Sequence, residues 1–387
     1  MKWTTALFIL VSFSLAGCSK TAEEATVSEQ IIWPGESWAT STPEAEGIDP
    51  GAIQALVDDI EKGEYGLVDA FMLIRNGKVV ADYRFQQDYL SIFAQRDQTD
   101  RQYNYDHPNW HPYLKDTQLH TLQSVTKSVT SAAIGIAIDR GLMADIDQPV
   151  MNLFEEYLPY VDVDRKQATR LEDLLTMQSG LAWEDPKDTD ALEGGDRWIE
   201  YVLSKPLQEE PGKVFKYNNG VSVLLGKALR ESTGQRIDEW ARENLFKPIG
   251  INDFYWKITP EGEVDTEGGL YLSTPDLARF GYLFLREGNW NDKQIISKEW
   301  VKQSTAAAVR HVDLEEGRLV SYGYQWWIPH HENSDAEIYA GYGYGGQYVL
   351  VVPDYDLVAV FNGWQIHDRA KLSTRWALQE RILPYIK

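Results

Sequence analysis

A serine and a lysine three residues apart mark a place where nucleophilic chemistry is possible. In Ser124-Val-Thr-Lys127, and nowhere else in the chain, lysine follows serine by three residues. A serine hydroxyl is a weak nucleophile at neutral pH and needs a base within hydrogen-bond reach. Residues three apart share one face of a helix, so Lys127 could lie beside the Ser124 hydroxyl. On the tetrapeptide alone, two polar residues in a first helical turn would explain the pattern equally well.

A tyrosine followed two residues later by asparagine supplies a second candidate. Tyr217-Asn218-Asn219 occurs once, and a helix is expected after Gly220. A phenol near a lysine ammonium can serve as a proton shuttle. An amide two residues on could donate a hydrogen bond to a substrate or orient the lysine. Lys127 and Tyr217 are therefore predicted to work as one proton-transfer unit, with either as the acylation base, and Asn219 to contact the substrate.

Glycines near the end of the chain form a third candidate. Gly343-Tyr-Gly-Gly-Gln347 leads into a run of β-forming residues. Glycine at a strand edge lets a ligand approach the backbone closely. A free backbone N–H group there can complete an oxyanion hole. Tyr344, Gly345 and Gly346 are therefore predicted to line the substrate site.

Hairpins and helices must hold these three segments together. Hairpins are predicted near both ends of the chain, at residues 70–85 and 347–361. Hydrophobic periodicity and capping residues predict helices over residues 50–62, 124–142, 170–177, 197–204, 221–233, 237–246, 273–284 and 368–382. Three surface loops are expected to wall the substrate pocket, at residues 87–120, 183–196 and 310–340.

This order of elements predicts an α+β fold. Strands at both chain ends would form one antiparallel sheet with flanking helices, and the helices of the middle would form an inserted part. The folded domain is expected over residues 46–387, with a sheet part at 46–144 and 261–387 and a mainly helical part at 145–260.

Composition excludes several function classes. The formal net charge is −22, from 37 basic and 59 acidic residues, and such a surface repels nucleic acid. No Gly-x-Ser-x-Gly elbow, His-Glu-x-x-His motif or phosphate-binding glycine loop occurs. We therefore expect neither a metal nor a cofactor, and no nucleic-acid partner. A single cysteine also rules out an intramolecular disulfide.

The N-terminus has the pattern of a processing signal. Lys2 precedes an apolar run, and Leu15-Ala16-Gly17-Cys18 resembles the lipobox of bacterial lipoproteins. The resemblance implies a signal peptide at residues 1–17, lipid on Cys18 and a tether at residues 18–45. Cys18 would then bind the lipid bilayer, and Ser19 favours the outer membrane, facing the periplasm. An ordinary secretory signal with a stray cysteine is the alternative.

The three candidate segments together resemble a known superfamily. Ser-x-x-Lys, Tyr-x-Asn and a glycine triplet on the last hairpin occur in the order found in serine β-lactamases and penicillin-binding proteins. The resemblance covers residues 45–387 and extends to the flanks at 119–131, 171–181 and 268–280. It is nearest to the branch of class C β-lactamases, D-Ala-D-Ala carboxypeptidases, related esterases and 6-aminohexanoate-dimer hydrolases. It implies a β-lactamase/transpeptidase-like fold, an acyl-Ser124 intermediate, and an oxyanion hole formed by the backbone N–H groups of Ser124 and Gln347.

One departure from the superfamily pattern bears on the substrate. The third motif of β-lactamases begins with a lysine that receives a carboxylate, whereas this chain has Tyr344-Gly-Gly. A neutral donor lacks the stronger charge-assisted bond. The sequence therefore favours an uncharged ester or linear amide, as a small molecule or short peptide-like substrate. A β-lactamase or carboxypeptidase with Arg310 or Arg318 holding the carboxylate remains open, as does a non-catalytic lipoprotein that binds a ligand.

Overall fold

A computed structural model describes Met1 and residues 31–101, 103–114, 117–160, 166–313, 318–330, 336–367 and 370–387. Contacts separate residues Met1–Ile31 from a compact unit, Ile32–Lys387, which is the subject here. The predicted lipidation site Cys18, and the predicted signal peptide beyond Met1, lie outside the described residues. Among the residues described, none of the helices has both the length and the apolar character needed to span a bilayer.

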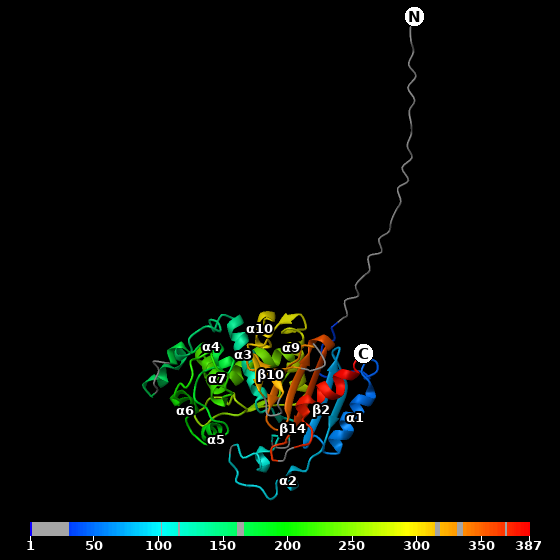
Figure 1. The fold of residues 1–387 in the computed structure, drawn as a ribbon, viewed down its shortest axis with the longest axis horizontal. Helices are drawn as coiled ribbons and strands as arrows, with labels where there is room; N and C mark the ends of the chain where they lie inside the picture. The colour runs from blue at the N-terminus through cyan, green and yellow to red at the C-terminus, as the bar shows by residue number, and fades with distance from the viewer. Residues whose placement is uncertain are drawn as a thin grey trace. The chain divides into compact units, whose positions relative to one another are not determined.

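A nine-stranded sheet organises the described part of Ile32–Lys387. Its spatial order is β1 (Ala39–Thr40), β3 (Lys78–Arg84), β2 (Val68–Arg75), β14 (Leu357–Gly363), β13 (Gln347–Val352), β12 (Tyr339–Gly343), β11 (Trp327–Pro329), β10 (Leu319–Tyr322) and β9 (Val309–Asp313). β1 runs parallel to β3, and the other neighbours are antiparallel. Figure 1 shows β2, from the start of the domain, beside β14, from its end. The predicted α+β fold is confirmed.

The central strands are apolar on both faces, because each face carries its own core. Alternate residues of a strand point to opposite sides of the sheet. On β13 and β14, Val349, Val351, Val358 and Val360 join one buried cluster. Their neighbours Leu350, Val352, Leu357, Ala359 and Phe361 join the other. Helices must therefore cover both faces.

Two groups of helices provide that cover. α3 (Val125–Asp139) and α9 (Thr274–Leu285) lie on one face, and α10 (Lys298–Ser304) packs against α3. α1 (Pro50–Glu61) and the C-terminal segment with α11 (Thr374–Ala377) lie on the other. The mainly helical part contains α4 (Leu171–Leu175), α5 (Lys187–Glu193), α6 (Trp198–Ser204), α7 (Asn219–Thr233) and α8 (Ile237–Ala241). The remaining short elements are α2 (Tyr89–Ile92), the sheet β4 (His120–Thr121), β6 (Leu270–Leu272) and β5 (Tyr255–Trp256), and the hairpin β7 (Asn289–Trp290) with β8 (Lys293–Gln294).

The described residues of segment 310–340 do not form the loop that the sequence predicted. They contribute β9, β10, β11 and the start of β12 to the sheet. These strands are short and interrupted by a polar, glycine-containing connection at Gly323, so no run of alternation is long enough to be recognised. The last predicted helix, 368–382, is also too long: α11 begins at Thr374, with a wider π-type turn at Leu378–Ile382.

Residues 32–45 are not a tether, which corrects the predicted boundary. The Tyr282 hydroxyl donates to the Ile32 carbonyl at 2.7 Å, and β1 pairs with β3. The rings of Trp33 and Trp38 lie 5.8 and 5.4 Å from the ring of Tyr282. Two aromatic side chains thus anchor a segment whose overall polar composition suggested a linker.

Candidate active site

Ser124 lies at the N-terminus of the buried helix α3. Its backbone is helical, with φ −64°, while the preceding Gln123 takes a left-handed conformation with φ +48°. This turn lets β4 lead directly into the helix. The Ser124 side chain makes no capping hydrogen bond to the helix backbone, so its hydroxyl remains for other partners. Because α3 directs its positive end toward Ser124, negative charge developing there is favoured.

Lys127 is that partner. Its side-chain nitrogen Nζ lies 2.9 Å from Ser124 Oγ and donates to the Glu267 carbonyl at 2.5 Å. The side chain is 1% exposed. The Glu267 segment is held against α3 by the backbone N–H of Leu270, which donates to Thr126 Oγ1 at 3.1 Å. The predicted pairing of Ser124 with Lys127 is thus present as a direct contact.

Tyr217 packs beside Lys127 from the mainly helical part. Lys127 Nζ lies 5.2 Å from the centroid of the Tyr217 ring. The other face of the site is aromatic, since Tyr217 stacks on Trp327 at 5.7 Å. Asn218 caps α7 by accepting the backbone N–H of Val221 at 3.2 Å, which fixes the turn that carries Tyr217. The ring is therefore held in place by stacking and by a helix cap.

Asn219 faces α5 in the described contacts. Its side-chain amide donates to Thr189 Oγ1 at 3.0 Å. Its amide oxygen is buried and has no hydrogen-bond partner among the described residues. The segment 183–196, predicted as a loop, here contains α5, and Thr189 belongs to it. Asn219 thus connects this segment to the turn that carries Tyr217.

The glycine-rich hairpin lies directly behind Ser124. A Cβ atom on Gly343 would come within 2.3 Å of the Leu122 carbonyl oxygen and 3.1 Å of Gln123 Cβ. Gly345 and Gly346 have φ of +80° and +102° and so make the turn that leads to Gln347. The end of β12 and the residues before Ser124 are thus in close backbone contact, which is where a two-amide oxyanion hole would have to be built.

Gln347 and Tyr344 differ sharply in exposure. The Gln347 side chain is fully buried, and its amide oxygen accepts from Asn362 Nδ2 at 3.2 Å. Tyr344 is 61% exposed, and its hydroxyl donates to the Ile366 carbonyl at 2.9 Å. That bond engages the phenolic proton that the sequence suggested for a substrate. Arg318 donates to Glu380 at 2.6 Å, and Arg310 is exposed on β9.

A buried polar network stabilises the chain segment that leads into Ser124. His120 Nε2 lies 2.9 Å from Asp69 Oδ2, and the Tyr89 hydroxyl lies 2.7 Å from both oxygens of that carboxylate. His120 Nδ1 also lies 2.8 Å from the Thr121 carbonyl oxygen. Asp69 belongs to β2, so this network fixes β4, and with it the turn before Ser124, to the main sheet.

Glu267, which contacts Lys127, and two acidic residues that interact with Glu267 did not figure among the sequence candidates. Glu267 Oε2 lies 3.7 Å from Lys127 Nζ. Burial and the charge of Glu267 raise the pKa of Glu193 to about 10 and that of Asp265 to about 6. Glu267 directly precedes Gly268 in a flank that resembled the superfamily, and this adjacency was the one available signal. No comparable signal marked Glu193 or Asp265 in the sequence.

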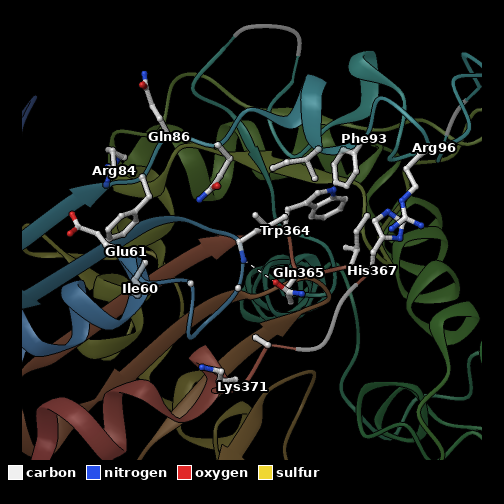
Figure 2. Close-up of a pocket in the computed structure, with 18 residues that line it drawn as sticks. Ile60, Glu61, Arg84, Gln86, Phe93, Arg96, Trp364, Gln365, His367 and Lys371 are labelled. Atoms are coloured by element: carbon white, nitrogen blue, oxygen red, sulfur yellow. Dashed lines mark hydrogen bonds between the residues drawn. The ribbon is translucent and has the colours of Figure 1, made fainter.

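A separate cavity lies behind the glycine-rich hairpin. Its volume is about 760 Å³, and Trp364, Gln365 and His367 line it (Figure 2). Gln365 Oε1 accepts the backbone N–H of Leu67 at 2.9 Å. This bond connects two chain segments that both line the cavity. Ser124, Lys127 and Tyr217 are not among its lining residues. In the described part of the chain, no group of three or more His, Cys, Asp or Glu residues is arranged to hold a metal ion.

Comparison with known proteins identifies the family of this chain. The family described as Beta-lactamase matches residues 53–380. The chain belongs to the beta-lactamase family. The 6-aminohexanoate-dimer hydrolase of Paenarthrobacter ureafaciens is 25% identical over 342 residues, which cover 83% of this chain and 79% of that protein.

Solved structures of the family share the fold. EstCE1, a hydrolase with promiscuous acyltransferase activity, has a TM-score of 0.65 at 15% identity, over 86% of this chain and 97% of that one. A family VIII carboxylesterase has a TM-score of 0.62 at 16% identity, over 86% and 94%. This member of the beta-lactamase family is therefore a hydrolase with the β-lactamase fold, whose relatives include serine hydrolases acting on esters and amides.

Proposed function

We propose that this protein cleaves an ester or linear amide through an acyl intermediate on Ser124. The 2.9 Å contact between Lys127 Nζ and Ser124 Oγ, made by a buried lysine, carries the proposal. Such a pair supplies the base that a serine nucleophile needs. The relatives named as an aminohexanoate-dimer hydrolase and a carboxylesterase support the reaction class.

In acylation, Ser124 Oγ forms a bond to the substrate carbonyl carbon and its proton moves to Lys127, directly or through Tyr217. The carbonyl π electrons move to the oxygen. When the tetrahedral intermediate collapses, the carbonyl re-forms, the bond to the leaving group breaks, and the leaving group takes a proton from Tyr217, which Lys127 reprotonates. Water then attacks the acyl carbon and gives a proton to Lys127, directly or through Tyr217. The bond to Ser124 Oγ breaks, the acid is released, and Ser124 Oγ takes that proton back.

The backbone N–H groups of Ser124 and Gln347 are proposed to bind the oxyanion. The close approach of Gly343 to Leu122 and Gln123 supports this placement. One such donor is worth about 3 kcal/mol of transition-state stabilisation. A crystal of the phosphonylated protein tests it: one phosphonate oxygen should lie within hydrogen-bond distance of both amides, and an oxygen directed to solvent would exclude the assignment.

Labelling with a fluorophosphonate probe tests the enzyme against a non-catalytic binding protein. The wild-type protein should gain the probe mass on the Ser124 peptide and hydrolyse a short-chain p-nitrophenyl ester. Ser124→Ala should do neither. A Ser124→Ala variant that still labels or still turns over would place the nucleophile elsewhere, and an inert wild type would favour the binding protein.

The substrate is proposed to be uncharged at the position where β-lactamases bind a carboxylate. Tyr344 brings no positive charge, its hydroxyl bonds Ile366, and Arg318 is paired with Glu380. The kcat/KM for a p-nitrophenyl ester should exceed that for nitrocefin. Tyr344→Lys should reduce the ratio of these two values. A wild-type preference for nitrocefin would instead favour the β-lactamase or carboxypeptidase activity.

We also propose that Cys18 carries the lipid that holds the enzyme at the outer membrane, facing the periplasm. The sequence Leu15-Ala-Gly-Cys18 is the support for this proposal. Metabolic labelling with a fatty-acid analogue and membrane fractionation test it, with Cys18→Ser as the control. Equal labelling of the Cys18→Ser protein, or recovery of the wild-type protein in the soluble periplasm, would contradict it.

A further inference from the structure

Glu267 is placed to act on the charge of Lys127. Besides the carbonyl that accepts from Lys127, its carboxylate Oε2 lies 3.7 Å from Lys127 Nζ. The side chain is 5% exposed. Asp265 fixes this turn, because its Oδ1 accepts the backbone N–H groups of Glu267 at 3.1 Å and Gly268 at 3.0 Å. Water therefore does little to screen the pair.

Glu193, at the C-terminal end of α5, is hydrogen-bonded to Glu267. Two carboxylates cannot share such a bond unless one of them keeps a proton. Burial, and then the charge and hydrogen bond of Glu267, raise the pKa of Glu193 to about 10. At neutral pH Glu193 therefore keeps its proton and is the donor in this bond.

A second lysine, Lys257, lies near the Glu193–Glu267 pair and is fully buried. It donates to the Tyr105 hydroxyl at 3.1 Å and lies 4.5–5.6 Å from the rings of four aromatic residues. Lys257 and Asp265 act on each other electrostatically. The ionisable groups around the Glu193–Glu267 pair and Lys127 are Tyr103, Tyr105, Tyr217, Lys257, Asp265 and Tyr271. The positive charge of Lys257 offsets the negative charge of Asp265. The negative charge of the Glu193–Glu267 pair is therefore not neutralised by Lys257 and can act on Lys127.

We propose that Glu267, hydrogen-bonded to Glu193, stabilises the ammonium that forms on Lys127 when Ser124 loses its proton. This deepens the proposed serine-hydrolase function and rests on it. The proton moves from Ser124 Oγ to Lys127 Nζ, Glu267 stays a carboxylate, and Glu193 keeps its proton. Charge stabilisation that is preorganised around a reacting group needs no rearrangement during reaction. Glu267 and Glu193 are thus positioning residues for the base.

The pH dependence of kcat/KM for a p-nitrophenyl ester tests this proposal in the full chain. Glu267→Gln removes the negative charge, so activity at pH 7 should fall about tenfold or more and the acidic limb of the profile should move to lower pH. Glu193→Ala leaves Glu267 without its donor, which concentrates the charge toward Lys127, so the acidic limb should move to higher pH. Glu243→Gln, an exposed carboxylate paired with Lys247, is the matched control.

Shifts of opposite sign separate this role from structural damage, which would lower kcat in both variants without moving the limbs apart. If Glu267→Gln does not fold, the direction of the Glu193→Ala shift still decides. This inference alone would be overturned if both variants keep the acidic limb at the wild-type pH while the wild-type protein labels at Ser124 and Ser124→Ala does not. A wild type that neither labels nor turns over would overturn the proposed function and this inference with it.

Discussion

The proton-transfer role proposed for the buried Lys127 can be tested at a single side chain. Losing a positioned acid or base costs about 10²–10⁴-fold in rate. Lys127→Ala and Tyr217→Phe should each lower kcat within or beyond that range. Because the two are predicted to act as one unit, the double variant should lose much less than the product of the single losses. Steady-state kinetics of the four proteins measure this, and fully multiplicative losses would show independent action.

Glu193 should make stability fall as pH rises. Its pKa in the fold is about 10, against an ordinary value of 4.5. The folded protein therefore binds a proton that the unfolded chain releases, and the stability gained below pH 4.5 is lost progressively as pH rises toward 10. Glu193→Gln keeps the hydrogen bond without the ionisation. Its Tm should exceed that of wild type at pH 9, with each kcal/mol worth about 2–4 °C, and the two should converge at pH 4.

Thermal scans from pH 4 to 9 measure the difference, with Glu243→Gln as the control. Parallel curves for wild type and Glu193→Gln would show that Glu193 is ionised in the fold. A steeper curve for Glu193→Gln than for wild type would show that the sign is wrong.

At the scale of elements, the short strand β4 depends on the Asp69–His120–Tyr89 network. Removing one partner of a buried hydrogen bond leaves the other group unsatisfied, which typically costs about 1–3 kcal/mol. Asp69→Asn replaces one acceptor oxygen with a donor, so it should destabilise the protein by about 1–3 kcal/mol. Urea unfolding measures this, and the control is Asp82→Asn at an exposed position of β3, expected within about 0.5 kcal/mol of wild type. Equal midpoints for the two variants would mean that the network contributes little.

Contact between the glycine-rich hairpin and the turn before Ser124 gives a second element-scale prediction. Gly343→Ala adds a Cβ 2.3 Å from the Leu122 carbonyl, so the hairpin must move. A misplacement of about 1 Å can cost about 10²-fold in rate, and we expect a loss of that order in kcat/KM for the ester. Gly35→Ala is the control, since nothing lies within 4 Å of its added Cβ. Wild-type activity in Gly343→Ala would mean that the two segments tolerate separation.

An element could be predicted from the sequence when the residues that specify it lie close together in the chain. The hairpin at β2 and β3 carries Asn76-Gly77 between long β-forming runs, and α3 has a continuous apolar stripe, so both were predictable. The strands β9, β10 and β11 were not, because three to five residues carry too little alternation. The site followed the same rule. Ser124 and Lys127 are three residues apart, whereas Glu193, Glu267 and Lys257 meet only through tertiary packing.

For the whole molecule, the order of motifs predicted that both chain ends share one sheet, since the flanking patterns were strands and the middle was helical. The sequence could not show that residues 32–45 pack on α9 and β3, because contacts such as Tyr282 to Ile32 join residues about 250 positions apart. Composition averaged over a polar segment hid the two tryptophans that fix it.

The pairing of β2 with β14 also determines when this protein can fold during its synthesis. β2 ends at Arg75, but its partner spans Leu357–Gly363, so the ribosome must make nearly the whole chain before the central pair exists. Until then β2 and β13 each have an open edge, and open edges invite aggregation. A nascent chain stopped at Asp356 should therefore be insoluble or chaperone-bound. The same delay keeps the central sheet unformed for as long as the chain is being made, which would suit the export through a translocation pore that the proposed lipidation of Cys18 requires.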